Sequence, residues 1–140
     1  VLSPAIAIAK IWYGGDINYT EPRKELARRA TEIWHETVAV PLQYVAGSRR
    51  YENAVAFYSA DQPHVFTHQD AARAPWVTPE DIDRAGLLIV CAEKDKGCLR
   101  SSAGIKSSRI RRAELTVAHS YWGYTAPPVS FTITIVPPGR

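Results

Sequence analysis

The chain has 140 residues, which is enough for one domain with a buried core, and its 46% hydrophobic and 22% charged residues are ordinary for a folded soluble protein. The net charge of +3 is mild and no basic run exceeds two residues, which argues against a nucleic-acid-binding arm. No stretch approaches the roughly 20 apolar residues of a membrane-spanning helix, and the two cysteines do not form a CxxC metal or redox motif.

Residues 1–19 are predicted to be a connector that precedes a single α/β domain at 20–140. Val1–Tyr13 is apolar apart from Lys10, and Gly14-Gly15 ends this run. The sequence contains no methionine, so we expect a fragment or a processed product.

The first predicted helix runs from Thr20 to about Thr37. Thr20 can cap its N-terminus, and Pro22 suits its first turn. The spacing of one helical face predicts an inner stripe of Leu26, Ala30, Ile33, Trp34 and Thr37.

A strand, a glycine turn and a helix follow in direct succession. Leu42–Ala46 is apolar, Gly47 and Ser48 break the run, and helical spacing continues to Tyr58. This order predicts the first unit of a parallel sheet, with the turn at the carboxyl end of its strand, where open α/β sheets bind ligands. A lone glycine is no GxGxxG motif, so a dinucleotide fingerprint is absent.

This turn is the first candidate ligand site. Backbone amides at a helix start and two arginines suit a phosphate or a sugar carboxylate. The simpler alternative is a solvated helix N-terminus that binds nothing. A small hydrolase using Ser48 or a histidine site is a further alternative, although the turn lacks the GxSxG pattern of a nucleophile elbow. The candidate residues are Gly47, Ser48, Arg49, Arg50, Tyr51, Glu52 and Asn53.

The next elements alternate between strand and helix. His64–Thr67 is predicted to be a short strand. A helix begins at Thr78-Pro79, where a cap, an early proline and acidic residues coincide, and it ends at Gly86. The run Gly86–Cys91 is apolar at every side chain, which predicts a strand in the middle of a covered sheet.

The C-terminal third is predicted to end the sheet with an antiparallel strand pair. Ile110–Ala118 and Val129–Ile135 both alternate apolar and polar residues. The predicted fold is therefore a three-layer α/β/α sandwich with a mainly parallel, Rossmann-like sheet and this antiparallel pair at its C-terminal end. Four basic residues are predicted to form a solvated strand edge that discourages edge-to-edge pairing: Lys106, Arg109, Arg111 and Arg112.

Two further clusters admit a functional and a structural interpretation. Tyr121, Trp122 and Tyr124 in one loop could stack on a sugar or enter a membrane interface, or they fold back on the core. His64, His68 and Asp70 have the spacing HxxxHxD and could hold a metal. Two histidines at the edge of a polar loop explain this pattern better. No metal site is therefore predicted.

Several stretches together resemble the C-terminal soluble region of bacterial membrane glycosyltransferases. These are the polytopic enzymes with lipid-linked sugar donors related to protein mannosyltransferases and aminoarabinose transferases. The likeness covers about Pro22 to Pro138. The stretches that carry it are Tyr44–Gly47, Asn53–Ser59, Pro63, Trp76-Val77 before an acidic helix start, Gly86–Val90 and Val136-Pro137-Pro138.

The resemblance implies a parent with many transmembrane helices that transfers a sugar from a polyprenyl-phosphate donor. Residues 1–19 would then be the connector from that membrane region, which is missing from this sequence. This domain would then be an accessory domain on the periplasmic side of the bacterial inner membrane. Its partners would be the membrane domain of the same parent chain and a lipid-linked sugar or the membrane surface, with no cofactor and no nucleic acid. The catalytic carboxylate of that family lies near its first membrane helices, so no catalytic residue is assigned here. The alternative is a free-standing Rossmann-like ligand-binding module without catalysis.

The two cysteines are predicted to form a disulfide. Six residues, with Gly97 among them, separate Cys91 from Cys98, and they allow the chain to double back. These are the only cysteines, and the resemblance places them outside the cytoplasm. The alternative is a buried free Cys91 and an exposed free Cys98.

Overall fold

The computed structural model describes residues 22–66, 78–105, 109–118, 120–121, 124–125 and 127–139. The helices in this part of the chain are α2 (Arg23–Thr37), α3 (Arg49–Tyr58), α4 (Pro79–Ala85) and α5 (Lys96–Ala103). Its strands are β1 (Tyr44–Gly47), β2 (His64–Val65), β3 (Leu87–Ala92), β4 (Arg111–Val117), β5 (Ser120–Tyr121), β6 (Tyr124–Thr125) and β7 (Val129–Val136).

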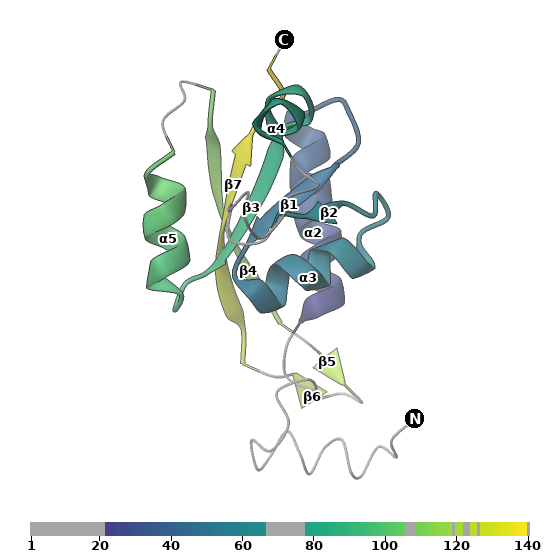
Figure 1. Ribbon diagram of the computed structural model, residues 1–140. Coiled ribbons are helices and arrows are strands. Elements are labelled where there is room, and N and C mark those ends of the chain that lie inside the picture. Colours follow the sequence, from purple (N-terminus) through teal and green to yellow (C-terminus); the bar gives the residue numbers. More distant parts are fainter. Residues whose placement is uncertain are drawn as a thin grey trace.

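One mixed sheet organises these elements, with the strand order β2-β1-β3-β7-β4. β1 pairs in parallel with both β2 and β3, whereas β7 is antiparallel to both β3 and β4. The predicted antiparallel pair at the C-terminal end is confirmed, and the sheet is parallel at its other end. Helices α2 and α3 lie on one side of the sheet and α5 on the other (Figure 1).

Two groups of buried side chains occupy the two faces of the sheet. Because successive strand residues point to opposite faces, Leu88 and Val90 join the larger group, which includes Trp34 of α2, whereas Ile89 and Cys91 join the smaller group near α5. β3 is therefore buried on both faces, as its unbroken apolar run predicts.

Helix α2 packs its predicted stripe only in part. Leu26, Ala30 and Trp34 are fully buried, but Thr37 is exposed in the last turn, so its predicted inward position is wrong. Thr31 faces inward instead, where its hydroxyl and that of Ser59 are 2.7 Å apart. The helix begins at Arg23 with Pro22 as its N-cap, which makes no capping bond, and the predicted cap Thr20 lies outside the described residues.

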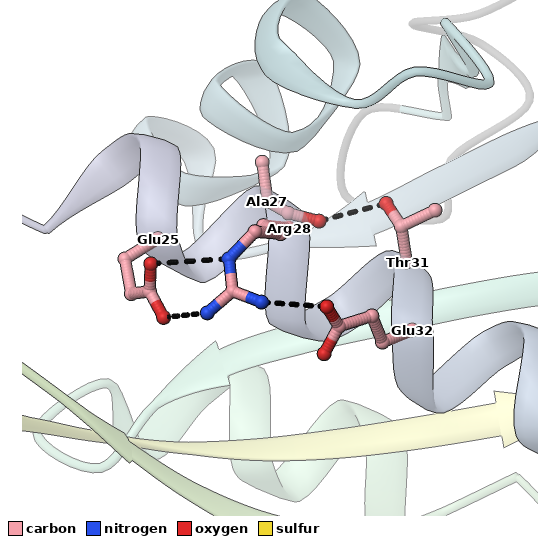
Figure 2. Close-up of polar contacts among 5 residues, drawn as sticks. All are labelled: Glu25, Ala27, Arg28, Thr31 and Glu32. Atoms are coloured by element: carbon pink, nitrogen blue, oxygen red, sulfur yellow. Dashed lines mark hydrogen bonds and ion pairs between the residues drawn. The ribbon is translucent and has the colours of Figure 1, made fainter.

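The outer face of α2 carries a short chain of ion pairs. Figure 2 shows Arg28 between Glu25 and Glu32, with its Nη1 2.6 Å from Glu32 Oε1. The Thr31 hydroxyl on another side of the helix donates to the Ala27 carbonyl oxygen at 2.7 Å (Figure 2). These three charged residues thus lie toward solvent, whereas Lys24 of the same helix places its ammonium 5.6 Å from the centroid of the Tyr58 ring of α3.

The short helix α4 has the predicted start and end. The Thr78 hydroxyl accepts from the Asp81 amide, and the Asp81 carboxylate accepts from the Thr78 amide, which completes a capping box. Gly86 ends the helix with φ +82°, and a Cβ there would lie 2.8 Å from both the Trp34 ring and the Val136 carbonyl oxygen. No helix in the described ranges is long and apolar enough to cross a membrane.

The disulfide between Cys91 and Cys98 is confirmed, with Cα atoms 5.6 Å apart. It joins β3 to the first turn of α5, a helix that falls within the polar stretch after β3. The loop predicted to carry the aromatic residues contains the short antiparallel pair β5–β6, which places Tyr121 opposite Tyr124. Trp122 lies outside the described residues.

Candidate functional site

The predicted ligand turn lies at the carboxyl end of β1, between the ends of two neighbouring strands. The chain leaves β1 through α3 toward β2 on one side, whereas β3 pairs with β1 on the other side. This is a topological switch point, the position at which open α/β sheets commonly bind ligands. The strand order therefore places the turn from Gly47 to Asn53 at the carboxyl ends of the strands, as the sequence predicts.

Gly47 allows β1 and β3 to approach each other closely at this edge. Its φ is +136°, and a Cβ built on it would lie only 1.9 Å from the Val90 carbonyl oxygen. That carbonyl oxygen instead accepts a hydrogen bond from the Ser48 amide at 2.8 Å. Only glycine has both the backbone freedom and the absent side chain that this contact requires.

Ser48 and Asp95 close the space between the ends of the two strands. The Ser48 hydroxyl donates to Asp95 Oδ2 at 2.8 Å and accepts from the Ala92 amide at 3.0 Å. Asp95 Oδ1 accepts from the Cys98 amide at 3.1 Å and so caps α5. One serine and one aspartate therefore connect β1, β3 and the starts of α3 and α5.

The sequence did not identify Asp95, although a signal was present. An aspartate followed three residues later by a free amide near a helix start is a common N-cap pattern. The bond from Ser48 joins residues 47 positions apart, and local spacing cannot reveal such a contact.

This network occupies most of the groups that a ligand at the turn would need. The Ser48 carbonyl oxygen accepts from the Tyr51 and Glu52 amides, each at 2.9 Å. Arg49, Arg50 and Asn53 are exposed, and the Asn53 side-chain amide donates back to the Arg49 carbonyl oxygen at 2.8 Å. Anion binding at this turn stays a prediction, because no ligand has been tested against these residues.

Tyr51 is part of the core packing in this region. Its ring meets Phe131 of β7 edge to face, with centroids 4.6 Å apart. Such contacts fix α3 against the sheet and orient the turn that precedes it.

Glu52 is a buried acid in the first turns of α3. Its side chain is fully buried, and neither carboxyl oxygen has a hydrogen-bond partner within the described part of the chain. Burial raises the pKa of Glu52 to about 7, while the nearby Gly47 amide and the Arg49 charge act in the opposite direction. The Gly47 amide is near enough to favour the carboxylate but falls short of hydrogen-bond geometry. Glu52 therefore lies beside the strand end rather than facing solvent.

Neither of the two described histidines is bonded to Ser48, so the histidine base of a Ser-His-Asp centre is not found among the described residues. His35 Nε2 lies 2.8 Å from Asp61 Oδ2, and the His64 ring lies beside Tyr44. His64 is also the only described member of the metal pattern, since His68 and Asp70 lie outside the described residues. No group of three or more His, Cys, Asp or Glu side chains in the described ranges could hold a metal ion.

Replacing Ser48 with alanine is expected to destabilise the protein by about 2 kcal/mol, because the half-buried Ala92 amide loses its acceptor and Asp95 loses a donor. The measurement is urea unfolding followed by circular dichroism. Ser101→Ala, at an exposed position in α5, serves as the control. Equal stability of the two variants would contradict a structural role for Ser48.

Comparison of the chain with protein-family models, with curated proteins and with solved structures found no match.

Proposed function

We propose that this chain is the periplasmic C-terminal accessory domain of an integral-membrane glycosyltransferase, with a three-layer α/β/α fold and no sugar transfer of its own. The observation that carries the proposal is the Cys91–Cys98 disulfide. Structural disulfides persist in oxidising compartments and are rare in the cytosol. The bridge is consistent with the extracytoplasmic position that the family resemblance implies.

The geometry of the switch point supports an accessory role rather than a catalytic one. Ser48 is nearly buried and is bonded to Asp95, so its hydroxyl is held in the structure. The disulfide encloses the loop that contains Asp95 and so keeps this bond in place. In the proposed parent, the membrane domain holds the polyprenyl-phosphate donor, and this domain contacts the membrane domain and the lipid-linked sugar or the membrane surface.

A second candidate function is a free-standing Rossmann-like binding module. The position of the Gly47 turn between β1 and β3 favours it, because this is the usual ligand position of such sheets. The sequence encoded upstream of Val1 discriminates between the two. A long hydrophobic region there supports the membrane parent, and its absence supports the free-standing module.

The compartment is tested by thiol labelling in intact cells that make the natural protein. We expect a membrane-impermeant maleimide to label Cys98, the less buried of the two cysteines, only after a membrane-impermeant reductant has been added, because the proposed compartment is oxidising and lies outside the inner membrane. Labelling without reduction would contradict the periplasmic assignment. A separate assay for sugar transfer by the purified chain tests the accessory role, and measured transfer would contradict that role alone.

A further inference from the structure

In the part of the chain that the structure describes, strand β4 forms one edge of the sheet, and its outer backbone groups have no strand beside them. The Glu93 amide donates to the Ser130 carbonyl oxygen, so the even-numbered residues of β7 direct their backbone groups toward β3 and the odd-numbered ones toward β4. Ala113 lies opposite Ile133. The backbone groups of Ala113 therefore face β7, and those of its two neighbours face outward.

The outward-facing backbone groups of β4 belong to Arg112, Glu114 and Thr116. Within the described ranges, no backbone group of another element pairs with them. The side chains of these three residues are exposed as well. This is an edge strand of seven residues, which is long for an edge that has no partner.

The charges along this edge favour one self-pairing register. If two copies of β4 pair antiparallel about Ala113, Arg112 of each copy lies directly opposite Glu114 of the other. Registers centred on Arg112 or on Glu114 place like charges opposite each other, which is destabilising. Of these three registers, only the one centred on Ala113 places opposite charges face to face, although the sequence predicts that the basic residues discourage edge pairing.

We propose that the protein forms a symmetric homodimer by antiparallel pairing of β4 with β4 of a second copy, centred on Ala113. The twofold axis is perpendicular to the sheet and extends it across both copies. The backbone groups of Arg112 bond with those of Glu114 of the second copy, and the two side-chain charges on that face pair twice. Within one copy, Arg112 Nη2 donates to the Ser102 carbonyl oxygen of α5 at 3.3 Å. This inference stands independently of the proposed function.

Sedimentation of the 140-residue chain as a function of concentration tests the dimer. We expect a dissociation constant of roughly 10–500 μM, since one strand edge is a small interface. Arg112→Glu and Glu114→Arg should each weaken dimerisation by about tenfold or more, because each places like charges opposite each other twice. An equimolar mixture of the two variants should dimerise again, since every facing pair is then opposite in charge.

Control variants separate this register from a general effect of charge. Arg29→Glu and Glu36→Arg make the same charge changes at exposed positions of α2 and should leave the dissociation constant unchanged. Glu114→Pro removes an outward amide at an edge position, where proline is compatible with a strand, and should abolish the dimer. A wild-type chain that stays monomeric up to about 1 mM would overturn the proposal. A dimer that the mixed charge variants fail to restore would also overturn it.

Discussion

Replacing Glu52 with glutamine is expected to raise the free energy of unfolding at about pH 8 by about 3 kcal/mol and to flatten its dependence on pH. The wild-type carboxyl is fully buried without a hydrogen-bond partner among the described residues, and burial raises its pKa from 4.5 to about 7. Glutamine has nearly the same shape as the protonated acid and carries no charge to be buried.

The direction of the pH dependence follows from which state holds the proton. Below about pH 4.5, Glu52 is protonated in both the folded and the unfolded protein, and its full contribution to stability is present. Between about pH 4.5 and about pH 7, the unfolded chain loses this proton while the folded protein keeps it, so stability falls as the pH rises. Above about pH 7 both states are ionised, and the contribution of this group is constant.

Urea unfolding at several pH values, followed by circular dichroism, measures this effect. Glu36→Gln makes the same chemical change at an exposed position in α2 and should leave the pH profile unchanged. The prediction is contradicted if the free energies of unfolding of wild type and of Glu52→Gln change with pH in parallel across this range. That result would show that the Glu52 carboxyl is solvated or paired in the folded protein.

The parts of the fold that the sequence predicts are those specified by local chemistry. Thr78 and Asp81 cap each other within one turn, and Gly86 ends the helix at its predicted position. The apolar run of β3 is buried as expected, because a strand that is covered on both faces of the sheet carries apolar side chains on both faces. The disulfide also follows from a short loop between the only two cysteines.

The side chains that the sequence misplaced depend on distant neighbours. Thr134 belongs to the polar side of an alternating strand, yet it is fully buried because that face of the sheet is covered as well. Glu52, Val55 and Ser59 share one helical face by spacing, and this face turns inward. The helical spacing therefore indicates that Glu52 shares a face with buried residues. A charged residue on such a face is nevertheless more often expected to point toward solvent.

The candidate site is predicted in position but not in its internal connections. The strand, glycine turn and helix correctly place the turn at a strand end. The bond from Ser48 to Asp95 depends on β3 being adjacent to β1, and that adjacency follows from the whole strand order rather than from any local pattern. A turn that looks open in the sequence is therefore occupied by the protein's own side chains.

Replacing Gly47 with alanine is expected to destabilise the protein by about 4 kcal/mol, which combines backbone strain of about 1–3 kcal/mol with overpacking of similar size. The new Cβ would lie 1.9 Å from the Val90 carbonyl oxygen, and the φ of +136° is one that residues with a side chain rarely adopt. The neighbouring atoms are backbone atoms of a central strand, so they cannot move aside without separating β1 from β3.

Gly104→Ala is the matched control for this variant. Gly104 has φ −74° in the helical region, and a Cβ there meets its nearest atom at 3.5 Å. Its replacement should change the stability by no more than about 1 kcal/mol. Both variants are compared with wild type by urea unfolding and by the amide NMR shifts of Ser48 and Ala92, the residues bonded at the strand ends. If Gly47→Ala has the stability and the amide shifts of wild type, the prediction is contradicted. The two strands β1 and β3 could then separate at Gly47 at little cost in free energy.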